Sequence, residues 1–169
     1  MWQYYGQERP NFAITPKSNQ ESVWDYPRPP RINVETRHVV VWSQSGELVA
    51  ETSNAKRLCE TASPPQVYIP VSDVALSLLE ITPGSSFCEW KGRARYWALS
   101  GVGQAVGWDY PDVDAAYGLL AGHISFYPGR LKCTVAGEAV IPQPGEFYGG
   151  WITSELVGPY KGEPGTGHW

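Results

Sequence analysis

The chain has 169 residues, of which 42% are hydrophobic and 13% aromatic; this is enough to bury one core, so we expect a single domain with extensions. Eighteen glycines and 15 prolines favour many short strands and turns over long helices, which predicts a mainly β protein. The net charge of −4 provides no basic field for a phosphate backbone, so duplex nucleic acid is not an expected partner.

The sequence carries no signal for a membrane segment, a disulfide framework or a metal site. Its apolar runs are far shorter than the ~20 residues of a spanning helix, and the N-terminus lacks the pattern of a signal peptide. A soluble, cytoplasmic protein without a membrane partner is therefore expected. Cys59, Cys88 and Cys133 are widely spaced, which favours buried free thiols and predicts no disulfide, no metal and no cofactor.

The first 32 residues are predicted to form an extended arm. Aromatic residues from Trp2 to Tyr26 are scattered through it without a helical or strand period. Because disordered segments are poor in aromatics, we expect these side chains to dock on the core. A hairpin follows, with strands over 38–42 and 47–51 that are rich in β-branched residues.

Two further elements are expected before the centre of the chain. Residues 66–70 are predicted to form a strand whose end is marked by Pro70. A short helix is then predicted over 75–80, because Ala75 to Glu80 are good helix formers. Ser72 serves as its cap, and Pro83-Gly84 ends it.

A central hairpin is predicted from strands over 88–100 and 104–110. A three-residue turn at 101–103 places Tyr96 opposite Trp108. One face then carries four aromatic side chains, those of Trp90, Tyr96, Trp108 and Tyr110. Because Gly92 and Ala94 leave a gap between them, we interpret this face as the wall of a ligand pocket; an ordinary β core is the alternative.

The last third of the chain is predicted to contain a helix, a hairpin and a C-terminal wrap. Asp112 caps the helix over 113–121, and strands over 123–127 and 131–135 pair around a Pro-Gly turn. We therefore divide the chain into an arm (1–32), a single β domain (33–136) and a Gly/Pro/aromatic-rich wrap (137–169).

Six ordered segments carry a family resemblance: Trp24-Asp25-Tyr26-Pro27-Arg28-Pro29-Pro30-Arg31, Arg57-Leu58-Cys59-Glu60, 65–70, Cys88-Glu89-Trp90-Lys91-Gly92, Trp108-Asp109-Tyr110-Pro111-Asp112 and Phe126-Tyr127-Pro128. Through them, residues from about 24 to 130 resemble domain of unknown function 427, a family that also carries a nucleotidyltransferase-like label. The resemblance implies a compact antiparallel domain similar to β-tent folds, in which two sheets lean together over a pocket. Relatives of that architecture often bind zinc through four cysteines, which this chain lacks.

Three charged residues lie in the same segments: Arg57, Glu60 and Lys91. A pair of Glu60 with Arg57 or Lys91 is either purely structural or part of a site. In the second case Arg57 or Lys91 binds an anionic group, and Glu60 acts as a base or an anchor. Strand parity places Lys91 opposite the aromatic face unless a bulge or a strand end re-aims it.

The sequence thus predicts a β domain that binds a small molecule through Arg57, Glu60, Tyr68, Trp90, Lys91, Tyr96, Trp108, Tyr110 and Tyr127. An enzyme acting on a phosphate-bearing molecule is the alternative, with Glu60 and Lys91 as candidate catalytic residues. A protein-interaction module that uses the aromatic arms is the second alternative. No glycine-rich phosphate loop supports the nucleotidyltransferase label, and helix capping explains the one close acidic pair, Asp112 and Asp114.

Overall fold

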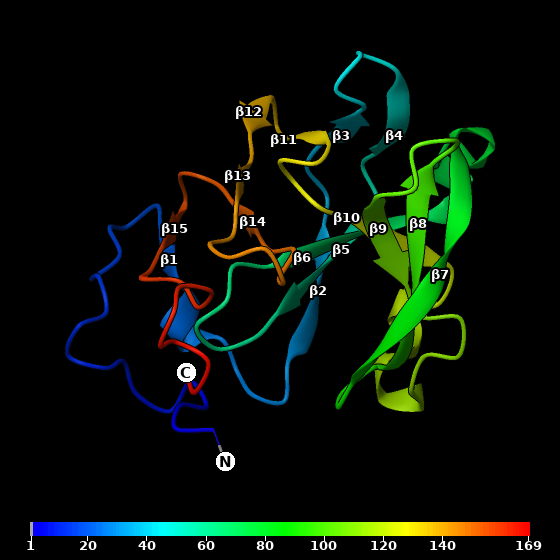
Figure 1. Cartoon of the computed structure of the whole chain (residues 1–169). Coiled ribbons are helices and arrows are strands. Elements are labelled where there is room, and N and C mark those ends of the chain that lie inside the picture. The colour runs from blue at the N-terminus through cyan, green and yellow to red at the C-terminus, as the bar shows by residue number, and fades with distance from the viewer. Residues whose placement is uncertain (1) are drawn as a thin grey trace.

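The computed structural model describes residues 2–169 and consists mainly of antiparallel β-sheet, which confirms the predicted fold class (Figure 1). The larger sheet has seven strands in the order β2 (Arg31–Glu35), β5 (Ala55–Cys59), β6 (Gln66–Pro70), β10 (His123–Phe126), β9 (Ala105–Asp109), β8 (Gly92–Leu99) and β7 (Leu79–Cys88). The smaller sheet has four, in the order β12 (Glu138–Ala139), β11 (Lys132–Val135), β3 (Val39–Trp42) and β4 (Leu48–Thr52).

The remaining elements are short. β1 (Glu21–Ser22) pairs in parallel with β15 (Leu156–Val157), and β13 (Ile141–Pro142) pairs with β14 (Trp151–Ile152). The helical residues form 3₁₀ helices over Val23–Asp25, Val71–Asp73, Leu76–Leu78 and Ala115–Leu120. None of the helices within residues 2–169 has the length and apolar character that crossing a bilayer requires.

The centre of the seven-stranded sheet is buried on both faces, as strand β6 shows. Alternate residues of a strand point to opposite faces, and on β6 Val67 and Ile69 join the main apolar core. That core is shared with the four-stranded sheet through Val39 and Val41 of β3. Tyr68 lies between Val67 and Ile69 in the sequence and joins a second, more aromatic cluster on the other face.

The predicted pairing of Tyr96 with Trp108 in the central hairpin is confirmed, whereas the predicted three-residue turn and the extent of the first strand are corrected. Tyr96 of β8 lies opposite Trp108 of β9, and the register then shifts at a bulge near the turn. The strand predicted over 88–100 is wrong at its start, because β7 ends at Cys88 and Cys88 pairs with Gly92. Residues 89–91 therefore form a turn, and Gly92 completes it with a φ of +96°, which residues with a side chain rarely adopt.

The helix predicted over 75–80 is wrong. Two three-residue 3₁₀ helices occupy 71–78, and β7 begins at Leu79, which pairs with Leu99 of β8. This long-range pairing outweighs local helix propensity, which is a weak preference. Pro83 and Gly84 lie at the irregularity in the β7–β8 ladder instead of ending a helix.

Two predictions after residue 110 also need correction. The second helix is the 3₁₀ helix over Ala115–Leu120, and its cap is Asp114, whose Oδ1 accepts from the Ala116 N–H at 2.9 Å, in place of Asp112. The strands predicted over 123–127 and 131–135 exist, but they do not pair as a hairpin. β10 lies between β6 and β9 of the large sheet, whereas β11 pairs with β3, so the turn after β10 passes the chain from one sheet to the other.

Trp24 and Tyr26 of the N-terminal arm are buried against the β domain, as predicted, whereas Tyr5 and Phe12 are each 43% exposed. Trp24 is fully buried, and its indole N–H donates to the carbonyl of Pro159 at 3.1 Å. Phe12 stacks on Trp169 with ring centroids 5.2 Å apart, and both rings meet Trp24 edge to face. The two terminal segments therefore lie side by side, which the β1–β15 pairing also requires (Figure 1).

We expect Gly107→Ala to lower the free energy of unfolding by about 1–3 kcal/mol through overpacking. A Cβ at Gly107 of β9 would lie 2.7 Å from the carbonyl oxygen of Ser125 and 2.9 Å from Cδ1 of Phe126. Gly118→Ala is the matched control, because nothing lies within 4 Å of its Cβ position. Urea unfolding of both variants measures the difference, and equal stabilities would contradict the tight β9–β10 contact.

Candidate functional site

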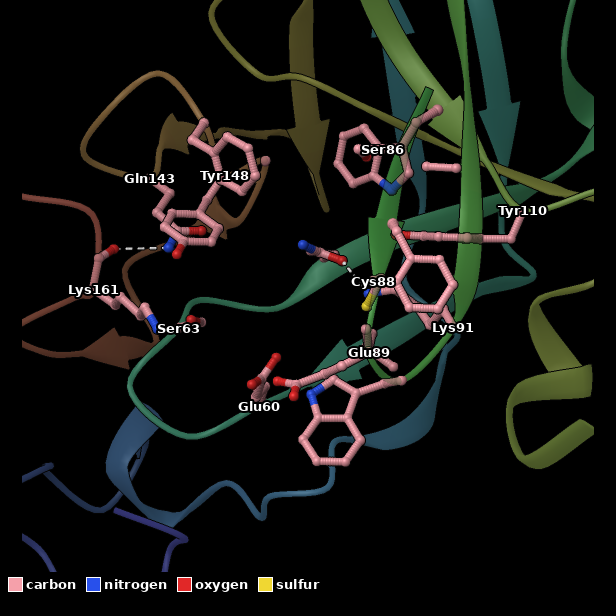
Figure 2. Close-up of a pocket in the computed structure, with 18 of the residues that line it drawn as sticks. Glu60, Ser63, Ser86, Cys88, Glu89, Lys91, Tyr110, Gln143, Tyr148 and Lys161 are labelled. Atoms are coloured by element: carbon pink, nitrogen blue, oxygen red, sulfur yellow. Dashed lines mark hydrogen bonds between the residues drawn. The ribbon is translucent and has the colours of Figure 1, made fainter. Parts of the chain in front are cut away.

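A cleft of about 330 Å³ opens on the aromatic face of the seven-stranded sheet (Figure 2). Its walls come from β5, β6, the β7–β8 hairpin, β9 and both terminal segments. The space between the two sheets is filled by the main apolar core. The cleft therefore lies on the opposite face of the large sheet from the space between the sheets, where the resemblance implied a pocket.

The wall of the cleft on β9 is aromatic and rigidly held. The Trp108 indole N–H donates to the Tyr68 hydroxyl at 3.2 Å, and that hydroxyl donates to Oε1 of Gln66 at 3.0 Å. The rings of Trp108 and Tyr127 lie with centroids 4.6 Å apart. Of the two small residues from which the gap was inferred, Ala94 lines the cleft, whereas Gly92 lies at the end of the β7–β8 turn and does not line it.

The wall tyrosines are neutral hydrogen-bonding groups. Burial raises the pKa of Tyr127 to about 12 and raises the pKa of Tyr68 and Tyr110 well above the ordinary tyrosine value. The Lys91 ammonium opposes this rise at Tyr110. The phenols therefore stay protonated at neutral pH and add no negative charge to the cleft.

Lys91 enters the cleft from the turn between β7 and β8 (Figure 2). Only 4% of the residue is exposed. Its Nζ lies 3.4 Å from Oε1 of Gln66 and 5.2 Å from the ring centroid of Tyr110. Among residues 2–169, no Asp or Glu oxygen lies within 4.0 Å of this ammonium. Lys91 is thus a buried cation without a carboxylate partner.

Glu60 is held at the cleft by Arg28. The Arg28 side chain is fully buried, and its Nε donates to Oε1 of Glu60 at 2.9 Å. Its other N–H groups donate to three main-chain oxygens at 2.9–3.2 Å, those of Tyr4, Thr61 and Trp169. Arg28 therefore ties both terminal segments to the core and fixes the Glu60 carboxylate.

Lys161 reaches the cleft from the C-terminal segment and is 3% exposed. Its Nζ donates to the main-chain oxygen of Trp169 at 3.2 Å and lies 3.9 Å from the ring centroid of Trp2. The Arg28 guanidinium carbon lies 4.3 Å from the same ring. Burial and the charge of Arg28 lower the pKa of Lys161 to about 8.

Residues 31–137 match a family model described as domain of unknown function (DUF427). The match covers more than half of the chain and includes five of the six ordered segments that carry the resemblance; of the segment over 24–31 it includes only Arg31. The chain belongs to this family. No curated protein matches it in sequence.

Part of the cleft lies outside the region that matches DUF427. Tyr148 and Lys161 line it from the C-terminal segment, and Trp2 lines it from the N-terminal segment. Gly149 allows the C-terminal segment to approach the sheet, since a Cβ there would lie 2.3 Å from Cη2 of Trp108. In this DUF427 member the extensions therefore complete the cleft that the family domain begins.

The structure brings seven of the nine predicted site residues to the cleft: Glu60, Trp90, Lys91, Tyr96, Trp108, Tyr110 and Tyr127. Tyr68 lies behind the wall, where it holds Trp108. Arg57 lies outside the cleft and pairs with Glu21, because alternate residues of β5 face opposite ways and Leu58 faces the cleft. The predicted pairing of Glu60 with Arg57 or Lys91 is therefore wrong, and its partner is Arg28.

Sequence reasoning missed Arg28, Gln66 and Lys161 as site residues. Arg28 lies among prolines and aromatics in the segment over 24–31, one of the segments that carry the family resemblance. This setting could have indicated Arg28 as a candidate site residue. Lys161 stands alone in a Gly/Pro-rich stretch, and only the folded contacts bring it to the cleft. Within residues 2–169, no three His, Cys, Asp or Glu side chains gather closely enough to hold a metal ion.

We expect the wild type to gain about 1–2 kcal/mol of stability over Lys161→Met between about pH 8 and about pH 10. The folded pKa of about 8 lies below the ordinary value of 10.5, so the unfolded chain binds more protons in this window and unfolding becomes less favourable as pH rises. Burial and the charge of Arg28 lower the pKa of Lys161, whereas the carboxylates of Glu60 and Glu89 raise it. The Lys161 Nζ also lies 5.7 Å from the ring centroid of Tyr148.

Urea unfolding across this window measures the effect as a difference between the two proteins. The raised pKa values of the buried tyrosines and cysteines lower the stability of both proteins at higher pH. These contributions are the same in both proteins and cancel when the two free energies of unfolding are subtracted. Lys132→Met, at an exposed lysine, is the control and should follow the wild type. A pH-independent difference would contradict the account of Lys161.

Proposed function

We propose that this DUF427 protein binds a small organic anion with a planar, apolar part. The observation that carries the proposal is Lys91, a 4% exposed ammonium that lines the cleft with no carboxylate within 4.0 Å among residues 2–169. Lysine is almost never fully buried unless it is paired, because removing an ammonium from water is unfavourable. A ligand carboxylate or phosphate supplies the missing partner.

The contacts that Lys91 makes within the protein are weak substitutes for an anion. Its distance of 3.4 Å to the Gln66 amide oxygen is at the long end for a hydrogen bond, and the Tyr110 ring centroid is 5.2 Å away. The hydrogen bond and the cation–π contact orient the ammonium, but neither neutralises it. The ammonium is therefore held in place for an anion.

The aromatic wall supports a planar group on the ligand. Trp90, Tyr96 and Trp108 line the cleft, and the Tyr96 hydroxyl is held by Oγ of Ser86 at 2.6 Å. Aromatic rings with few convergent polar groups are typical of small-molecule sites, and a volume of about 330 Å³ suits a single ring system with one charged group. Aromatic acids, aryl phosphates and nucleoside monophosphates have this composition.

A thermal-shift screen with charge-matched pairs tests the proposal. Each anion is compared with its uncharged counterpart: phenyl phosphate with phenol, benzoate with benzamide, adenosine monophosphate with adenosine, and glucose 6-phosphate with glucose. Binding to the folded state alone raises the melting temperature by mass action. Stabilisation by at least one aromatic anion, and by neither glucose 6-phosphate nor the neutral counterparts, is expected. Equal shifts for anions and neutral molecules, or no shift with any anion, would refute the proposed function.

A further inference from the structure

Glu60 has one carboxylate oxygen that no group of the protein occupies. Arg28 Nε donates to Oε1 at 2.9 Å, and among residues 2–169 no side-chain or main-chain donor forms a hydrogen bond to Oε2. Glu60 lines the cleft, and its side chain is 24% exposed. A buried arginine therefore holds the carboxylate in one orientation, while the second oxygen remains open as a hydrogen-bond acceptor.

Glu60 and Lys91 are separate polar groups of the same cleft. The Lys91 Nζ lies more than 4.0 Å from either carboxylate oxygen of Glu60, so the two side chains form no ion pair. Figure 2 shows Glu60 just beyond the end of β5 and Lys91 in the turn between β7 and β8. An anionic group bound to Lys91 therefore leaves Glu60 available, and a ligand that fills the cleft meets a donor at one place and an acceptor at another.

The charges around Glu60 are balanced within the protein. The cations of Arg28 and Lys161 lie 4.3 and 3.9 Å from the ring centroid of Trp2, and the Trp2 indole N–H donates to Oε1 of Glu89 at 3.1 Å. Two cations thus accompany two carboxylates, those of Glu60 and Glu89. A neutral donor suits Glu60 better than a charged one, since a further ion would disturb this balance and would have to leave water.

We propose that the anion bound in the cleft carries a neutral hydrogen-bond donor on its planar part, a hydroxyl or an amino group, and that Glu60 Oε2 accepts from it. The proposal rests on the proposed function, because Lys91 binds the anionic group. The ligand class is thus a hydroxy- or amino-substituted aromatic carboxylate or phosphate. A site with such an acceptor discriminates against the analogue without the donor, because the carboxylate oxygen then loses water and gains no partner.

Matched benzoates test the donor on the wild-type protein. Titration calorimetry compares 3- and 4-aminobenzoate with 3- and 4-methylbenzoate, because the amino and methyl groups are similar in size and only the amino group donates. We expect at least one aminobenzoate to bind about tenfold or more tightly than its methyl counterpart. If each methylbenzoate binds as tightly as its amino counterpart, the donor site is refuted and the anion site stands. If none of the four compounds binds, both proposals fail.

Glu60→Gln tests whether Glu60 is the acceptor. Arg28 only donates, so the glutamine oxygen faces Arg28 and its NH2 group replaces Oε2. A donor then meets the amino group of the ligand, and the preference for the aminobenzoate should disappear. The methylbenzoate should bind at least as tightly as to the wild type, because a negative charge has been removed from the cleft.

Glu89→Gln is the matched control for this variant. Glu89 also lines the cleft, but it is exposed, and its replacement should keep the preference for the aminobenzoate. Urea unfolding shows whether each variant is folded, and the wild-type comparison does not depend on either variant. A Glu60→Gln protein that keeps the preference, or a Glu89→Gln protein that loses it, would overturn the assignment to Glu60.

Discussion

Arg28→Met is expected to lower the free energy of unfolding by about 3–5 kcal/mol. The Arg28 side chain is fully buried, and it joins Glu60 to main-chain oxygens of both terminal segments. Methionine fills a similar volume but leaves the Glu60 carboxylate without its cation and removes the Arg28 donors from the main-chain oxygens of Tyr4 and Thr61, while the oxygen of Trp169 keeps Lys161 as a donor. Denaturant unfolding followed by tryptophan fluorescence measures the loss.

Arg9→Met is the matched control for this experiment. Arg9 pairs with Asp25 through two hydrogen bonds of 2.7 Å, but the two side chains are 40% and 47% exposed. Exposed ion pairs contribute little to stability because solvent screens them, so Arg9→Met should lose far less stability than Arg28→Met. Equal losses in the two variants would contradict the role of Arg28 as the tie between the terminal segments and the core.

Lys91→Met is expected to raise the Kd of the tightest aromatic anion from the screen by about 30- to 1000-fold, a loss of about 2–4 kcal/mol. The ammonium is buried, so its attraction for an anion is little screened by solvent. The same substitution should leave the stability of the unliganded protein unchanged or raise it, because it removes a buried cation that has no carboxylate partner.

This combination of lost binding and retained stability distinguishes a binding residue from a structural one. A structural lysine would lose stability on replacement and would leave any residual affinity near that of the wild type. Lys132→Met is the control, because Lys132 is exposed on β11 and lies away from the cleft. Titration calorimetry gives the affinities, and urea unfolding without ligand gives the stabilities. A Lys91→Met protein that binds as tightly as the wild type would contradict the anion site.

Local patterns in the sequence were enough to predict the aromatic wall. Alternation along β8 and β9 and a glycine-rich turn placed Tyr96 opposite Trp108, because side-chain period and turn length together define a hairpin register. Gly92 and Ala94 indicated a gap; Ala94 lines the cleft, whereas Gly92 does not. These features depend on residues that are close together in the chain, so the local sequence pattern is enough to predict them.

The charged part of the site could not be predicted in the same way. Strand parity placed Lys91 away from the aromatics, whereas the chain reverses at 89–91 and directs it into the cleft. Arg28 reaches Glu60 across 32 positions of sequence, and Lys161 comes from a segment without regular structure. Arg57 was predicted as a site residue, but it lies on the face of β5 away from the cleft. Long-range packing, which no local pattern encodes, decides these positions.

A crystal structure of the protein with phenyl phosphate shows whether the cleft holds an anion against Lys91. We expect the phosphate within hydrogen-bonding distance of Lys91 Nζ and the phenyl ring against Trp108 and Tyr96. A phosphate bound elsewhere on the surface, with the cleft occupied only by solvent, would contradict it.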